Sequence, residues 1–349
     1  MTSFAFSFAW FSASFSFPLL AIKLGYSYII VGFLGFLGAL SFPVVSLLYL
    51  RARIRAIRLG IILPIVALFA LLVALYLIGF SLFLVIAIFA AIVQAFWWIS
   101  MEISLPLLDA EKGPERYSAG WGIPNAVAPL IAGYLIEYYG FHLLFLLSAL
   151  VFIASLLFIP RISRVDQLNF QGKISILYAA SIFFAGLFSG FIYFVLEPIL
   201  KVSGVSYSEV GLIVSIYGIM AAAGYIILNY TRDYSIRTFS ILSSILIFPT
   251  FILGFSLSFP FLMISVILSG FGVSIAMTKV LSYLTAKTSP RKAIFVYETT
   301  FGAGFMAGSL GISVLVQSTG MISAGMIFIL PLIYAIFLLF RGSERTSGP

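Results

Sequence analysis

The sequence predicts an all-α polytopic membrane protein whose twelve transmembrane helices form two six-helix bundles related as parallel repeats. Three observations predict this fold class: the composition, the number of long apolar segments, and a motif that occurs twice. The chain has 349 residues, of which 62% are hydrophobic and only 9% are charged. A soluble protein of this length needs far more charge to cover its surface, so the chain is expected to lie in a membrane.

The apolar segments set the number of spans. About 20 apolar residues cross a bilayer as a helix, and short loops that carry Gly, Pro or Ser separate twelve segments of roughly that length. The expected spans cover residues 4–22, 27–50, 57–79, 81–104, 117–138, 141–160, 174–199, 207–230, 237–257, 260–285, 293–316 and 320–340.

A repeated motif divides the spans into two sets of six. The pattern Gly-x-Ser-Tyr-x-x-Val-Gly occupies residues 25–32 and returns at residues 204–211, each time at the start of the second span of a set. Because order and orientation are preserved, the repeats are related by an axis along the membrane normal. The expected domains are an N-terminal bundle over residues 1–160, a cytoplasmic linker over 161–173 and a C-terminal bundle over 174–349.

The distribution of basic residues predicts the orientation. With the N-terminus inside, sixteen of the 19 Lys and Arg residues fall in inner loops or at the C-terminus. Only Lys23 and Lys201 fall outside, and Lys279 lies within a span. The positive-inside rule therefore predicts that both termini lie in the cytoplasm. We expect the protein to lie in the plasma membrane. The same distribution in short loops argues against nucleic-acid binding.

The fifth span carries a family resemblance. Residues 122–133 read Gly-Ile-Pro-Asn-Ala-Val-Ala-Pro-Leu-Ile-Ala-Gly, which is similar to the Gly-Pro-x-x-Gly-Gly antiporter motif of exporters in the major facilitator superfamily, with Ala in place of two glycines. With six plus six spans and a basic loop after the second span of each set, the chain resembles that superfamily over its whole length. The family's loop motif Gly-x-x-x-Asp is poorly kept: residues 46–58 hold arginines without an acid, while the second copy keeps Asp233.

The resemblance implies a mechanism. Two six-helix bundles would rock about a central site and expose it to each side in turn, commonly with coupling to a proton or ion gradient. In the family arrangement the fourth and tenth spans line the cavity from opposite bundles.

Charged side chains inside spans are functional candidates because burying them is costly. Glu102, Lys279 and Glu298 lie at similar depth in the expected cytoplasmic half. One hypothesis pairs Glu102 with Lys279 across an inner gate, and a second makes Glu298 a proton-coupling carboxylate. Two alternatives remain: Lys279 neutralises Glu298 within one bundle, or each side chain reaches the interface.

Four polar or aromatic residues are candidates for substrate binding. Gln94 and Trp98 share a helix face, being four residues apart, and an aromatic ring beside an amide suits a neutral or cationic organic solute. Asn125 and Tyr297 either line the cavity or bond to neighbouring helices. The alternative for Trp97 and Trp98 is ordinary packing or interfacial anchoring.

Four arginines recur at matching positions after the second span of each set. They are candidates for contacts that close an inner gate. The alternative is that their charges only determine the orientation of the spans in the membrane. The four arginines are Arg53, Arg58, Arg232 and Arg237.

These features predict a secondary active transporter that moves a small organic solute by alternating access, with proton-coupled export first and uptake of a sugar or similar neutral solute second. A membrane-embedded enzyme is disfavoured because clustered aspartates are absent and His142 is the only histidine. A receptor or scaffold would not need charges at matching depth in two bundles. We expect a monomer that contacts the lipid bilayer, the solute and a coupling proton, without a cofactor, a metal or nucleic acid.

Overall fold

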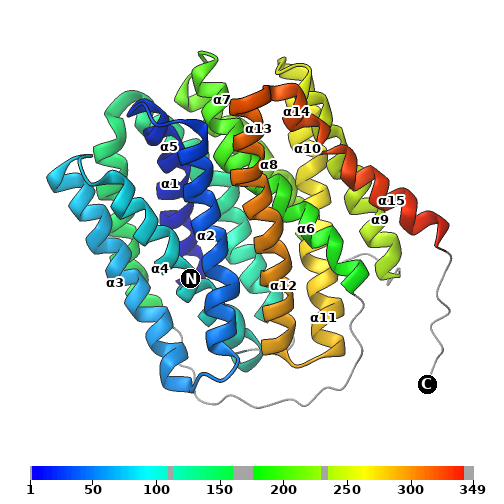
Figure 1. Cartoon of the computed structure of the whole chain (residues 1–349). Coiled ribbons are helices and arrows are strands. Elements are labelled where there is room, and N and C mark those ends of the chain that lie inside the picture. Colours follow the sequence, from blue (N-terminus) through cyan, green and yellow to red (C-terminus); the bar gives the residue numbers. More distant parts are fainter. Residues whose placement is uncertain (1, 109–112, 160–175, 229–234, 342–349) are drawn as a thin grey trace.

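A computed structural model of the chain describes residues 2–108, 113–159, 176–228 and 235–341. Throughout these ranges the regular structure is helical, and the helices stand side by side as Figure 1 shows. The predicted linker, residues 161–173, lies outside the described residues. The predicted fold class is therefore confirmed as an all-helical membrane protein.

The first six spans use five long helices and a short terminal turn. Their bounds are α1 Thr2–Lys23, α2 Tyr28–Tyr49, α3 Ile54–Ile78, α4 Phe83–Leu108, α5 Gly113–Ser155 and η1 Leu156–Phe158.

The last six spans are more often interrupted. Their bounds are α6 Ile176–Phe191, η2 Ile192–Leu196 and α7 Glu197–Val202; α8 Tyr207–Leu228; α9 Ile236–Ile247 and η3 Phe248–Gly254; α10 Phe259–Ile275, η4 Ala276–Val280 and α11 Leu281–Lys287; α12 Pro290–Met306, η5 Ala307–Gly311 and α13 Ile312–Thr319; α14 Met321–Met326 and α15 Ile329–Phe340. The segments η2, η4 and η5 are π-helical turns inside otherwise continuous spans.

The span count agrees with the sequence once one long helix is divided. Eleven helices in the described ranges are long and apolar enough to cross a membrane, and the one over Gly120–Phe158 has 39 residues. At about 1.5 Å per residue it is roughly 58 Å long, about twice the hydrocarbon thickness of a bilayer. It bends at Gly140, whose φ of 82° is non-helical, so α5 contributes two crossings and the described chain makes twelve.

The duplication seen in the sequence returns in the backbone. Gly25 and Gly204 have φ values of 85° and 91°, and Gly140 and Gly320 have φ values of 82° and 85°. Each pair is separated by half the chain, and each member ends one span and starts the next. Only glycine adopts this conformation without steric cost. The equivalent turns of the two sets therefore both contain a glycine at this position.

The repeated motif forms a turn and a helix N-cap. Ser27 Oγ accepts a hydrogen bond from the backbone N–H of Ile30 at 3.4 Å. Ser206 Oγ accepts one from the backbone N–H of Glu209 at 3.2 Å, and Glu209 Oε2 accepts the N–H of Ser206 at 3.0 Å, which completes a capping box. The motif thus forms the start of α2 and of α8.

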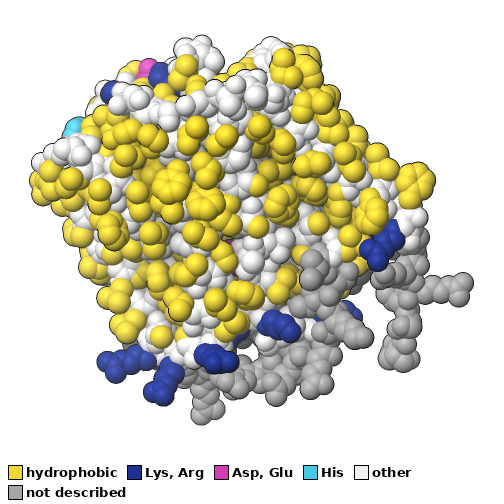
Figure 2. All heavy atoms as spheres, viewed as in Figure 1, with side chains coloured by type: hydrophobic (Ala, Val, Ile, Leu, Met, Phe, Trp, Pro, Cys, Tyr) yellow, Lys and Arg dark blue, Asp and Glu magenta, His cyan; other side chains and the backbone are white. Residues whose placement is uncertain are grey.

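The two sets of spans meet along two matching seams. Helix α2 packs against α12, η5 and α13, and α5 packs against α8. Figure 2 shows a broad hydrophobic belt over the visible surface, with most of the visible Lys and Arg at one end of the molecule. We call that end the basic face; the loops between α1 and α2 and between α7 and α8 lie at the opposite face.

Candidate functional site

Two carboxyl groups meet inside the molecule where the two sets of spans face each other. The carboxyl groups of Glu102 on α4 and Glu298 on α12 lie close enough to each other to interact directly. Glu298 is buried, with 3% of its surface exposed. A hydrogen bond between two carboxyl groups requires one proton, since two carboxylates have only acceptors. The pair can therefore bind and release a proton at a contact between the sets.

A cluster of tyrosines surrounds this pair and continues across the interior. Tyr297 lies close enough to Glu298, Glu102 and Tyr225 to interact with them electrostatically. Tyr225 donates a hydrogen bond to the sulfur of Met277 at 3.3 Å. These side chains come from α4, α8, α12 and η4, so the sequence-predicted Tyr297 sits among groups from both sets.

Asn125 makes a hydrogen bond between the sets. The hydroxyl of Tyr193, on the π-helical turn η2, donates to Asn125 Oδ1 at 2.7 Å. The Tyr193 ring lies 6.0 Å from the ring of Tyr217, and the Tyr217 hydroxyl lies 3.3 Å from Ser189 Oγ. Hydroxyl and amide groups from α5, α6, η2 and α8 therefore gather at mid-membrane.

Another carboxyl group in the interior, that of Glu197, lies one turn beyond Tyr193. Its side chain is 0% exposed, and neither of its carboxyl oxygens has a hydrogen-bond partner in the described part of the chain. Pro198 follows it directly in the chain. Together with Glu102 and Glu298 it adds a third carboxyl group to the described interior.

Gln94 and Trp98 are both buried on α4. Gln94 Nε2 donates to the carbonyl of Ala91, one turn earlier, at 3.2 Å, and Gln94 Oε1 is buried without a hydrogen-bond partner. Trp98 packs at 5.0 Å from Trp97 and 6.0 Å from Phe6. In this conformation Trp98 belongs to an aromatic cluster between α1 and α4.

Lys279 lies elsewhere than the gate hypothesis placed it. Its ammonium nitrogen donates to the Leu228 carbonyl at 3.2 Å and lies 4.8 Å from the Phe239 ring. Both partners belong to the last six spans, and the carboxyl that Glu102 meets is Glu298. The π-helical turn η4 contains Lys279 and adds a residue to the turn, so the side chain leaves the face that a regular α-helix would give it.

The three described arginines of the gate hypothesis have separate surroundings. Arg53 occupies the N-cap position of α3 without a side-chain cap bond, and Arg58 is exposed. Arg237 donates to the carbonyls of Leu338 and Leu339 at 2.9 and 3.0 Å, and so caps the end of α15. Arg232 lies outside the described residues.

One basic residue that the sequence did not single out joins the sets near the basic face. Arg291 Nη1 lies 3.2 Å from the carbonyl oxygen of Leu50 and 3.5 Å from that of Tyr49. It reaches from the start of α12 to the end of α2, whose last carbonyls are otherwise free to accept. The signal in the sequence was its place directly after Pro290 at the start of a span.

Two further hydrogen bonds join the sets at the opposite face, and the sequence missed both. Glu137 Oε2 accepts from the backbone N–H of Tyr207 at 2.7 Å, and Gln317 Oε1 accepts from the backbone N–H of Ile29 at 3.2 Å. Each acceptor precedes a positive-φ glycine by three residues. The repeated spacing was the available signal.

Glycines allow the closest approach along the same seams. A Cβ atom on Gly32 would lie 2.4 Å from Ser313 Oγ, and one on Gly211 would lie 2.4 Å from the carbonyl oxygen of Pro129. Both glycines end copies of the repeated motif. The motif therefore marks the two places where α2 and α8 press against the opposite set.

Comparisons with known proteins agree with this architecture. Residues 178–349 match the family model described as Major Facilitator Superfamily. The crystal structure of the human organic anion transporter MFSD10 (TETRAN) superposes with a TM-score of 0.71 at 15% identity, covering 97% of each chain. A mutant of the nucleoside transporter NupG superposes with a TM-score of 0.66 at 15% identity, covering 97% of this chain and 96% of that one. No curated protein sequence matches the chain.

Proposed function

Because residues 178–349 match the major facilitator superfamily and the whole chain shares that fold, we propose that the protein is a transporter that exports a small organic solute in exchange for protons. The moving parts would be the bundles over residues 1–160 and 174–349, joined by the linker over 161–173. The single observation that carries the proposal is the close approach of the Glu102 and Glu298 carboxyl groups from opposite sets of spans.

The pair couples proton binding to bundle movement through simple electrostatics. With one proton, the two carboxyl groups attract and hold α4 against α12. Without it, two like charges at about 4 Å and an effective dielectric near 20 repel by about 4 kcal/mol. That energy changes a two-state ratio by roughly a thousandfold, so loss of the proton favours separation of the bundles at this point.

The fifth span supports export over uptake. Its antiporter-like residues lie on the seam with α8, where a Cβ on Gly133 would lie 2.4 Å from the Tyr207 carbonyl oxygen and one on Gly218 would lie 2.5 Å from that of Asn125. Such close contact between α5 and α8 is what the small residues of that motif provide. The resemblance to family exporters is therefore accompanied by the packing that the motif serves.

The solute is proposed to be neutral or cationic. The described interior holds the buried carboxyl groups of Glu197 and Glu298 and the partly buried one of Glu102, while Lys279 turns toward α8 and α9. Aromatic rings and hydroxyl groups at Tyr193, Tyr217 and Tyr297 suit stacking and cation–π contact. MFSD10 and NupG carry names that refer to organic anions and nucleosides, and at 15% identity they support the fold alone.

Uptake of a neutral solute is the second candidate. The group formed by Asn125, Tyr193, Tyr217 and Ser189 offers both donors and acceptors at mid-membrane, which is what a hydroxyl-rich solute requires. A thermal-shift screen separates the candidates: stabilisation by polar sugars and not by lipophilic cations would favour uptake.

The basic face is proposed to be cytoplasmic, with both termini on that side, in a monomer of the plasma membrane. The distribution of Lys and Arg supports this orientation.

Coupling is tested with the variant Glu298→Gln in proteoliposomes, using a solute that stabilises the wild-type protein. We expect Glu298→Gln to abolish transport driven by a proton gradient while solute exchange continues, because Gln can still donate a hydrogen bond to Glu102 but cannot release a proton. The control is Glu209→Gln, since Gln also completes a capping box. Gradient-driven transport that persists in Glu298→Gln would remove Glu298 from the coupling mechanism.

A further inference from the structure

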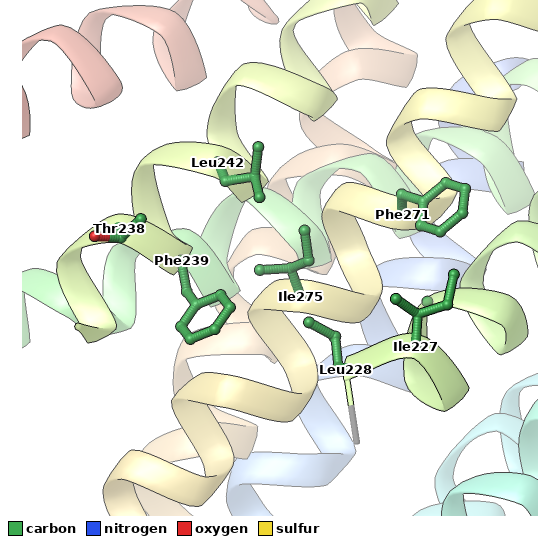
Figure 3. A pocket seen from close by; sticks show the side chains of 8 residues that line it. Ile227, Leu228, Thr238, Phe239, Leu242, Phe271 and Ile275 are labelled. Atoms are coloured by element: carbon green, nitrogen blue, oxygen red, sulfur yellow. The ribbon is translucent and has the colours of Figure 1, made fainter. Parts of the chain in front are cut away.

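An apolar groove lies on the outside of the last six spans, between α8, α9 and α10. It has a volume of about 340 Å³ and is lined by Gly224, Ile227, Leu228, Thr238, Phe239, Leu242, Phe271 and Ile275. Figure 3 shows Leu228, Phe239 and Ile275 pointing toward one another from the three helices. The volume lies within the range of small-molecule sites, and the lining is suited to a hydrocarbon chain.

The rim of the groove is open to the surface that the membrane covers. Ile227 and Leu242 are 51% and 43% exposed. Leu228 is the last residue of α8, and Thr238 and Phe239 lie in the first turn of α9. The groove therefore sits near the basic face, at the depth where the acyl chains of one leaflet meet their headgroups.

Among the described residues, one cationic side chain contacts the lining of this groove, at the end nearer the basic face. Lys279 donates to the Leu228 carbonyl at 3.2 Å and lies 4.8 Å from the Phe239 ring. Both partners line the groove, and both are uncharged. A carbonyl and a ring leave the positive charge of the ammonium available to an anion, and basic pockets between helices on this side of a membrane bind anionic headgroups.

We propose that the groove and Lys279 form a binding site for an anionic phospholipid of the leaflet at the basic face. One acyl chain occupies the apolar groove between α8, α9 and α10, and the phosphate contacts the Lys279 ammonium. The site gives a role to Lys279, which the carboxyl pair does not use. It is independent of the proposed transport function, because it faces the bilayer and not the interior.

Native mass spectrometry of the purified protein tests the site with two lipids that share the same acyl chains, phosphatidylglycerol and phosphatidylcholine. We expect phosphatidylglycerol to bind about fivefold more tightly or better, the effect of one nearby Lys. Lys279→Met should remove this preference, and Lys279→Arg should retain it. Lys23→Met, at the opposite face over the Phe141 ring, is the charge control.

The groove itself is tested by filling it. Ile227→Trp should reduce the binding of both lipids, whereas Ile219→Trp should not, although both isoleucines lie on α8 and are 51% exposed. Thermal unfolding of each variant shows whether it is folded. An unchanged preference for phosphatidylglycerol in Lys279→Met, or equal binding in the two tryptophan variants, would overturn the proposal. Neither result depends on transport.

Discussion

The Oε2 atom of Glu137 accepts a hydrogen bond from the backbone N–H of Tyr207 at 2.7 Å. The carboxylate of one set of spans thereby satisfies a free N–H at the start of a helix in the other set, where the helix dipole also favours a negative charge. Gln317 does the same for the N–H of Ile29 at 3.2 Å. An acid on one seam thus has an amide as its counterpart on the other.

Removing one of these acceptors should loosen the face opposite the basic face. We expect Glu137→Ala to cost about 1 kcal/mol of closure at that face, because an exposed hydrogen bond to a helix N-terminus is lost. A shift of that size favours the open form about fivefold. It should appear as faster maleimide labelling of Ser16→Cys, a buried position on α1.

Glu137→Gln is the control for this experiment. Because Gln317 already makes the equivalent bond with an amide, the glutamine variant should label almost as slowly as the wild type. Equal labelling of Glu137→Ala and wild type would mean that the bond does not contribute to closure.

The glycines of the repeated motif allow a second test of the same seams. Gly211→Ala would place a Cβ atom 2.4 Å from the Pro129 carbonyl oxygen, so α8 must move away from α5. We expect a loss of about 1–3 kcal/mol in the free energy of unfolding, as for other overpacked contacts. Thermal unfolding in detergent measures the change.

Gly311→Ala is the matched control, because a Cβ at that position meets no atom within 4 Å. It should leave stability unchanged or raise it slightly, since alanine favours helix. If the Gly211→Ala protein were as stable as Gly311→Ala, α8 would be able to move away from α5 without loss of stability.

Hydrophobic length and periodic loops were sufficient to predict the fold, because each span must satisfy its own backbone hydrogen bonds in the bilayer. The interruptions were not predictable in the same way. The π-helical turn η4 has no proline or glycine in its segment Ala276–Val280. The turn η2, Ile192–Leu196, is followed by Pro198, which has no N–H to donate to the carbonyl of Phe194, but this proline alone does not say which kind of interruption forms.

The sequence was sufficient to single out the charged residues of the candidate site, but not to predict which of them lie together. Glu102 and Glu298 stood out because buried charge is rare, and the structure brings them together. The Glu102–Lys279 pairing assumed a regular helix around Lys279, and the π-helical turn there changes its face. Glu137 and Gln317 looked like ordinary exposed polar residues, because their partners are backbone groups that carry no side-chain signal in the sequence.

The carboxyl pair predicts how conformation depends on pH. As pH rises and the shared proton is lost, repulsion between Glu102 and Glu298 should separate α4 from α12. We expect faster labelling of Tyr297→Cys, a buried position on α12 beside both carboxyl groups, at high pH than at low pH. In Glu298→Gln this pH dependence should disappear, because one partner no longer ionises. A pH response of wild-type size in that variant would place the responsible proton on another group.

Orientation can be measured directly because the natural chain contains no cysteine. Ser203 and Lys287 are exposed, in the turn after α7 and at the end of α11, so single cysteines there report opposite faces. In intact cells, a membrane-impermeant maleimide should label Ser203→Cys and leave Lys287→Cys unlabelled until the cells are permeabilised. Basic loops remain on the cytoplasmic side of most membrane proteins, which is the physical reason for this expectation. The reverse pattern would place the basic face outside, and the proposed export would then have to be reassigned as uptake.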